Sequence, residues 1–124
     1  MPSGNLVLVV DDDRAVLKAL KRVLRQHGFD TILFPSADAF RKYDDFDEVI
    51  CVILDLDLEE GSSIPLRRKL KANGNSVPVI YITGNDSETA RKAALQSGCI
   101  DYLVKPFPAK SLIESVKLAG ACPI

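Results

Sequence analysis

The chain alternates short apolar runs with longer stretches in which apolar residues recur every three or four positions. The apolar runs are rich in β-branched residues, as is typical of strands buried on both faces of a sheet. Five such runs predict strands at residues 6–10, 31–34, 49–54, 79–82 and 102–104. The stretches between them predict helices at about 13–27, 36–43, 64–72, 86–97 and 109–119. Repeated strand–helix units predict an α/β fold in which a parallel sheet carries helices on both faces.

Length, charge and hydropathy narrow the class of protein. The 124 residues fit one domain, and residues 120–124 are expected to be a tail or the start of a truncated linker. A net charge of −1 gives no reason to expect binding to nucleic acid or to an acidic membrane surface. No apolar run approaches the roughly 20 residues that span a bilayer, and the first residues do not resemble a signal peptide. We therefore expect a cytoplasmic protein.

Polar residues follow four of the five predicted strands. In an open parallel sheet, binding sites form beyond the carboxyl ends of the strands, so these residues are the first candidates for a site. They are Asp11, Asp12, Asp13, Asp55, Asp57, Thr83 and Lys105. Each has an ordinary alternative role, because an aspartate after a strand is usually a turn residue or a helix cap, and we favour the cap for Asp13. The combination at one sheet edge, rather than any single residue, predicts a site.

The chemistry that suits this set is phosphoryl transfer to a carboxylate. Clustered carboxylates repel one another and need a cation, and hard oxygen ligands favour Mg²⁺. Asp55 is the candidate nucleophile, which would form an aspartyl phosphate. Lys105 offers a compact positive charge and Thr83 a hydroxyl donor to the phosphoryl oxygens.

Five segments together resemble the receiver domains of bacterial two-component response regulators. They are Val9–Asp13, Phe34–Phe40, Val52–Leu58, Tyr81–Gly84 and Gly98–Phe107. The resemblance covers nearly the whole chain, and its motifs are specific jointly rather than singly. It implies a single receiver domain over residues 1–124 with a flavodoxin-like, doubly wound sheet of five parallel strands in the order 2-1-3-4-5. It also implies a signalling phosphoprotein whose only chemistry is self-catalysed phosphotransfer and autodephosphorylation.

The resemblance assigns roles to the residues at the strand ends. Asp55 becomes the phosphoacceptor. Asp11 and Asp12 become the acidic pair of a Mg²⁺ or Mn²⁺ site. Asp55 and the backbone carbonyl of Asp57 complete the ligands of the ion. Lys105 becomes the cation at the phosphoryl group.

The resemblance also implies a switch. Thr83 is expected to move toward the phosphoryl group, and Tyr102 to turn inward and fill the vacated space. Pro106 is expected to follow a cis peptide bond. The implied partners are a sensor histidine kinase or histidine phosphotransfer protein and a downstream protein that binds the fourth helix, fifth strand and last helix. A homodimer is a further possibility, whereas neither nucleic acid nor membrane is expected as a direct partner.

The loop after the phosphoacceptor departs from the family. It reads Leu58-Glu59-Glu60-Gly61-Ser62-Ser63, where the family often has a Met-Pro-Gly type of loop. Asp57, Glu59 and Glu60 make this rim unusually acidic. Our hypothesis is that the three acids strengthen the dependence on a divalent cation and alter the lifetime of the phosphoryl group.

The segment Asp55-Leu56-Asp57 also resembles the Asp-x-Asp motif of haloacid-dehalogenase-type phosphatases. In those enzymes the first aspartate is a nucleophile and the second an acid, which would make this chain a hydrolase. That motif usually lies on the first strand of a larger chain, whereas here it follows the third predicted strand. The phosphatase is therefore the less favoured alternative.

Overall fold

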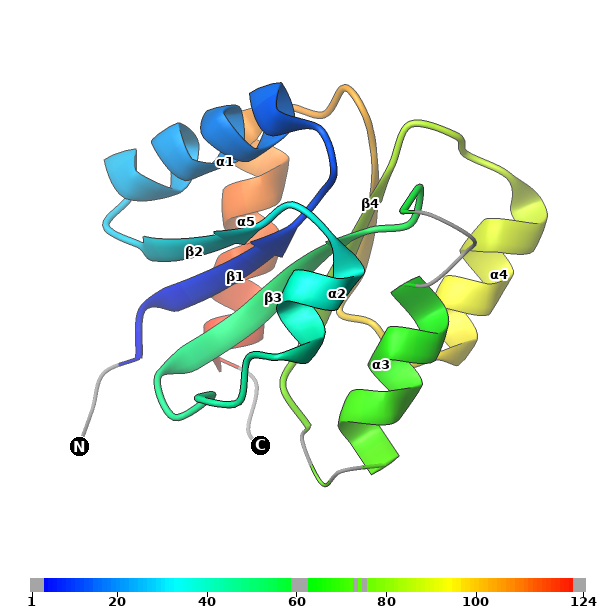
Figure 1. Cartoon of the computed structure of the whole chain (residues 1–124). Coiled ribbons are helices and arrows are strands. Elements are labelled where there is room, and N and C mark those ends of the chain that lie inside the picture. The colour runs from blue at the N-terminus through cyan, green and yellow to red at the C-terminus, as the bar shows by residue number, and fades with distance from the viewer. Residues whose placement is uncertain (1–3, 59–62, 73, 75, 122–124) are drawn as a thin grey trace.

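The computed structural model describes residues 4–58, 63–72, 74 and 76–121 (Figure 1). The strands are β1 (Leu6–Val10), β2 (Asp30–Phe34), β3 (Val49–Asp55), β4 (Val79–Thr83) and β5 (Asp101–Val104). The helices are α1 (Arg14–Gln26), α2 (Ala37–Arg41), α3 (Ser63–Ala72), α4 (Glu88–Gln96) and α5 (Ala109–Ala121). Every strand and helix expected from the hydrophobic pattern is present. Among these residues, no helix combines the length and the apolar character needed to cross a bilayer.

The strands form one parallel sheet in the order β2-β1-β3-β4-β5, which confirms the predicted flavodoxin-like topology. Figure 1 shows α1 and α5 on one face of this sheet and α2, α3 and α4 on the other. Successive residues of a strand point to opposite faces, so β3 contributes to both layers. Cys51 and Ile53 pack in the layer of α1 and α5, whereas Val52 and Leu54 pack in the layer of the other three helices. Two-sided burial explains why the strands are continuously apolar rather than alternating.

Side-chain caps determine where α1 and α2 begin. The Asp13 carboxylate accepts hydrogen bonds from the backbone N–H groups of Ala15 at 2.9 Å and Val16 at 3.4 Å. The Ser36 hydroxyl accepts one from the N–H of Ala39 at 3.1 Å. Both residues satisfy N–H groups that a helix leaves without an internal partner, so the predicted cap at Asp13 is confirmed.

Two predicted helix ends are wrong. α2 ends at Arg41 rather than near residue 43, and Tyr43 instead packs its ring at 5.5 Å from that of Phe34. α5 continues through Ala121 rather than ending near residue 119, and its last buried residue is Ala119. Residues 120 and 121 are therefore helical, and the rest of the expected tail, residues 122–124, lies outside the described residues.

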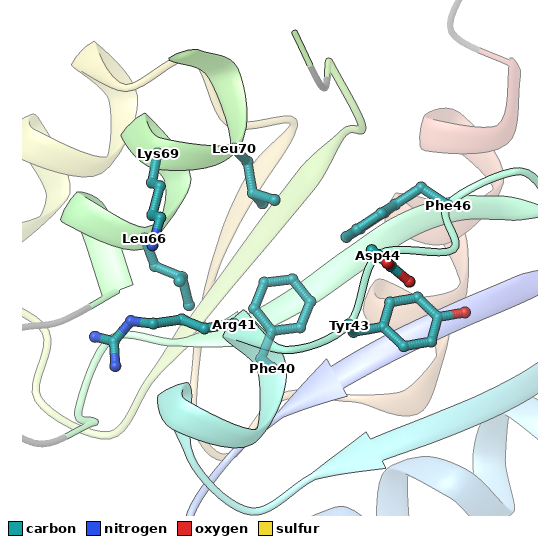
Figure 2. Close-up of a pocket in the computed structure, with 8 residues that line it drawn as sticks. All are labelled: Phe40, Arg41, Tyr43, Asp44, Phe46, Leu66, Lys69 and Leu70. Carbon is teal, nitrogen blue, oxygen red and sulfur yellow. The ribbon is translucent and has the colours of Figure 1, made fainter. Parts of the chain in front are cut away.

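An aromatic cluster in α2 and the loop after it borders a pocket against α3. The rings of Phe34, Phe40, Tyr43 and Phe46 meet edge to face with centroids 5.3–6.2 Å apart. Figure 2 shows the pocket between the rings of Phe40, Tyr43 and Phe46 and helix α3. Its volume is about 340 Å³. It is lined by Phe40, Arg41, Tyr43, Asp44, Phe46, Leu66, Lys69 and Leu70. None of the residues expected from the sequence to form the functional site lines this pocket.

Candidate functional site

The carboxyl ends of β1 and β3 bring three carboxylates together. Asp11 follows β1 and Asp55 ends β3, and both side chains are buried because the two strands are neighbours at the centre of the sheet. Asp12 is exposed beside them. One carboxylate oxygen from each of the three lies within 4.8 Å of the others. Carboxylates this close repel one another, and a hard divalent cation such as Mg²⁺ fits such a set of oxygen donors.

Lys105 reaches this cluster from the end of β5. Its Nζ donates a hydrogen bond to Asp11 Oδ2 at 3.0 Å and lies 3.5 Å from Asp55 Oδ1. Burial alone would lower the pKa of Lys105, but the hydrogen bond to Asp11 and the charge of Asp55 raise it above its ordinary value. The peptide bond between Lys105 and Pro106 is cis, as the resemblance implies. Lys105 is therefore a protonated cation held against both buried carboxylates.

Two hydrogen bonds from neighbouring residues hold Asp55 in position. The N–H of Asp57 donates to Asp55 Oδ1 at 3.0 Å, and the Ser63 hydroxyl donates to the Asp55 carbonyl from the first turn of α3. Burial, helped by the nearby charge of Asp11, raises the pKa of Asp55 to about 6 against the lowering effects of the Asp57 N–H and Lys105. Without a bound cation, Asp55 is thus a less acidic carboxyl than an exposed aspartate.

Asp57 makes contacts that the sequence did not predict. The resemblance implies a place at the ion only for its backbone carbonyl, and the rim hypothesis uses its carboxylate only as a negative charge. Instead, Asp57 Oδ1 accepts a hydrogen bond from Thr83 Oγ1 at 3.0 Å, and Asp57 Oδ2 accepts one from the N–H of Gly84 at 2.7 Å. The pairing of β3 with β4 causes this, because it places the ends of the two strands side by side. The other two acids of the rim hypothesis, Glu59 and Glu60, lie outside the described residues.

Tyr102 is connected to the beginning of α4. Its hydroxyl donates to Asp86 Oδ1 at 3.1 Å, and the guanidinium of Arg91 lies 4.7 Å from the centre of its ring. Arg91 also pairs with Asp86 at 3.2 Å. Tyr102 is 8% exposed in this structure, and its inward turn on phosphorylation stays a prediction. The sequence reading missed Asp86 and Arg91, whose only signal was their position around the start of a predicted helix.

Comparison with known proteins decides the family. A family model described as the response regulator receiver domain matches residues 7–117. The chain belongs to this receiver-domain family. The expected resemblance is thereby confirmed, and the phosphatase alternative is not favoured.

Relatives of this receiver domain are response regulators. The response regulator protein TodT of Pseudomonas putida is 31% identical over 116 residues, which cover 94% of this chain and 51% of TodT. The response regulator MprA of Mycobacterium avium is 33% identical over 113 residues, which cover 90% of this chain and 49% of MprA. The chain thus spans about half the length of the curated relatives it matches.

Solved receiver domains share the fold over nearly their whole length. A response regulator receiver protein from Burkholderia phymatum is 35% identical with a TM-score of 0.77, and the match covers 96% of this chain and 98% of that one. The crystal structure of FixJ-N is 28% identical with a TM-score of 0.84, and the match covers 96% of this chain and 95% of that one. These likenesses confirm the five-stranded receiver fold.

Proposed function

We propose that this receiver domain accepts a phosphoryl group on Asp55 and thereby changes a surface that a partner protein binds. The observation that carries the proposal is the arrangement around the buried Asp55 carboxylate, which has Lys105 Nζ 3.5 Å from its Oδ1 and the acidic pair Asp11 and Asp12 beside it. The lysine attracts phosphoryl oxygens, and positioned charges of this kind supply most of the acceleration in phosphoryl transfer.

The proposed phosphodonor is a phosphohistidine of a sensor histidine kinase or of a histidine phosphotransfer protein. A carboxylate oxygen of Asp55 forms a bond to phosphorus while the phosphorus–nitrogen bond breaks. The electron pair of that bond stays on the imidazole nitrogen. The ring leaves as neutral imidazole when its other nitrogen carries a proton, and otherwise it takes a proton from water as it leaves. In dephosphorylation, water attacks phosphorus, and Asp55 leaves as a carboxylate with release of inorganic phosphate.

Four residues would hold Mg²⁺ or Mn²⁺ in this site. Asp11, Asp12 and Asp55 offer carboxylate oxygens within 4.8 Å of one another, and Asp57 offers its backbone carbonyl. This donor set is of the hard, all-oxygen kind that such ions bind. The ion would supply positive charge that offsets the carboxylates and the phosphoryl oxygens.

The phosphodonor needs a surface beside Asp55. A groove of about 500 Å³ runs between α1 and the segment that follows β5, and Lys105 lines it together with apolar residues such as Val23 and Phe107. We propose that a helix of the phosphodonor lies in this groove. Its support is that the groove shares Lys105 with the site, so an apolar contact there would bring a phosphohistidine close to Asp55.

The downstream partner is proposed to bind α4, β5 and α5. The two large apolar side chains most exposed among the described residues are Leu95 on α4 and Leu118 on α5, each 59% exposed. Exposed apolar side chains of this size are favourable contact points for a protein partner. A second copy of the chain would suit the same face. The cytoplasmic location and the lack of direct contact with nucleic acid stay predictions from the sequence.

Labelling with a small phosphodonor tests the central proposal. The native protein is incubated with acetyl phosphate and Mg²⁺ and compared with Asp55→Asn by intact mass. We expect one added phosphoryl group on the native protein and none on the variant, because the amide lacks the nucleophilic oxygen anion. Equal labelling of the two proteins would contradict the proposal.

A further inference from the structure

Two hydrogen-bond donors at the end of β4 converge on one carboxylate. Thr83 Oγ1 lies 3.0 Å from Asp57 Oδ1, and the backbone nitrogen of Gly84 lies 2.7 Å from Asp57 Oδ2. The Thr83 oxygen also accepts from the N–H of Asn85 at 2.9 Å, which orients its hydroxyl hydrogen toward Asp57. Both oxygens of the Asp57 carboxylate are therefore used, in a two-point contact that resembles the binding of an anion by a hydroxyl and a backbone N–H.

The same donors border the proposed phosphorylation site. Asp55 pairs with Ile82 in the β3–β4 register, so Thr83 and Gly84 follow directly beyond the residue opposite Asp55. The chain between Asp55 and Asp57 is also closed into a tight turn, because the Asp57 N–H donates to Asp55 Oδ1 at 3.0 Å. A phosphoryl group on Asp55 would thus add its oxygens beside donors that already bind the Asp57 carboxylate.

We propose that the Asp57 carboxylate is an internal competitor of the phosphoryl group for the Thr83 hydroxyl and the Gly84 N–H. This inference rests on the proposed function of Asp55. In the unphosphorylated protein, Asp57 holds both donors. In the phosphorylated protein, the more highly charged phosphoryl group takes them, and Asp57 turns away.

Burial and charge favour such an exchange. Asp57 is exposed, unlike Asp55 and Thr83, so its carboxylate is able to leave the two donors for water without becoming a buried unpaired charge. Two anions near the same donors repel, which favours departure of one when the other arrives. Asp57 therefore acts as a positioning residue that sets how readily the switch hydroxyl becomes available.

The test measures binding of beryllium fluoride, a phosphoryl mimic, with saturating Mg²⁺ by NMR. Asp57→Ala frees both donors, so we expect it to bind the mimic roughly tenfold more tightly than the native protein, about the effect of one charge-assisted hydrogen bond. In the absence of the mimic, the Gly84 amide resonance is expected to move upfield in the variant because its N–H loses a charged acceptor. An unchanged Gly84 resonance, or no gain in affinity, would overturn the proposal.

Two comparisons separate competition from a general charge effect. Asp44→Ala removes one exposed aspartate from the loop after α2 and is expected to leave the affinity unchanged. In a Thr83→Val background, Asp57→Ala should give a smaller gain, because one of the two contested donors is gone. A gain of equal size in both backgrounds would show that Asp57 acts only by repulsion through space and would refute competition.

The outcome also distinguishes failure of this inference from failure of the proposed function. If Asp55→Asn binds the mimic as well as the native protein, the assignment of Asp55 is wrong. If the native protein binds, Asp55→Asn does not, and Asp57→Ala shows no gain, only the role of Asp57 is wrong. If Asp57→Ala does not fold, Asp57→Asn is the alternative variant, because the amide keeps the size of the side chain and one hydrogen-bond acceptor. For Asp57→Asn we expect a smaller gain in affinity for the mimic, together with an upfield shift of the Gly84 amide resonance.

Discussion

At the scale of single residues, the site depends on a buried acid whose charge is only partly compensated. Asp55 is 1% exposed and lies beside Asp11, while Lys105 contacts both carboxylates. Burial raises the pKa of Asp55 to about 6 despite that lysine. A protein seldom keeps such an acid for stability alone, and ionisable groups with strongly shifted pKa values are concentrated at functional sites.

This pKa predicts how stability depends on pH in the absence of divalent cations. The pKa of Asp55 is about 6 in the folded protein and has an ordinary value of 3.8. Between these two pH values, the folded protein keeps the Asp55 proton that the unfolded chain has released. The free energy of unfolding contributed by Asp55 should therefore fall as pH rises from about 3.8 to about 6 and stay low above that. Asp55→Asn should lack this loss and be more stable than the native protein at pH 7.

Urea unfolding in EDTA, followed by circular dichroism at several pH values between 4 and 8, measures the effect. The difference in free energy of unfolding between Asp55→Asn and the native protein should grow from pH 4 to about pH 6 and then level off. A constant difference would mean that the pKa of Asp55 is not raised by folding.

At the scale of secondary-structure elements, two tyrosine hydroxyls attach the two ends of α4 to the sheet. Tyr102 of β5 donates to Asp86 just before α4, at 3.1 Å. Tyr81 of β4 lies 3.0 Å from the Ser97 hydroxyl at the other end of this helix. Since α4 belongs to the proposed partner face, these contacts connect the strand ends of the site to the surface that a partner would read.

We predict that the two contacts act on different ends of the helix. Tyr102→Phe keeps the ring over which Arg91 lies but removes the hydroxyl, so amide hydrogen exchange should speed up at the start of α4. Tyr81→Phe is the matched control and should speed exchange at its carboxyl end instead. Each variant should lose about 0.5–1.5 kcal/mol of stability, as is typical of one hydrogen bond. Equal exchange changes along the whole helix in both variants would contradict separate attachment.

At the scale of the whole molecule, the sheet gathers residues that are far apart in the chain. Asp11 and Lys105 are separated by 94 positions, yet they share a hydrogen bond because β1, β3, β4 and β5 run parallel and end at the same edge. The carboxylates at that edge repel in the folded protein and are dispersed in the unfolded chain. A cation that binds them should therefore favour the folded state.

We predict that Mg²⁺ raises the melting temperature of the native protein in a concentration-dependent way. Asp12→Asn removes an exposed carboxylate of the cluster without disturbing the buried core, so it should reduce this shift strongly. Differential scanning fluorimetry from zero to 20 mM MgCl₂, with equal ionic strength set by NaCl, measures it. An Mg²⁺-dependent shift of the same size in Asp12→Asn and native protein would place the ion elsewhere.

The hydrophobic pattern was sufficient to predict the strands, the helices and the polar residues at the strand ends. Continuous apolar runs of β-branched residues have few alternatives to buried strands, and parallel strands must place Asp55, Thr83 and Lys105 at one edge. The helix cap at Asp13 was predictable as well, because a cap acts only on the next two or three residues of the chain.

The pairing of side chains across that edge, in contrast, depends on how the strands pack in three dimensions. Thr83 and Asp57 are 26 residues apart, and nothing local distinguishes a carboxylate that binds a neighbouring strand from one in water. Arg67 and Arg68 are neighbours of the same residue type, yet Arg67 is 5% exposed whereas Arg68 is exposed. The Nε and Nη1 atoms of Arg67 have no hydrogen-bond partner among the described residues. Local pattern specifies which face of an element is apolar, but hydrogen bonds between elements depend on distances that packing alone sets.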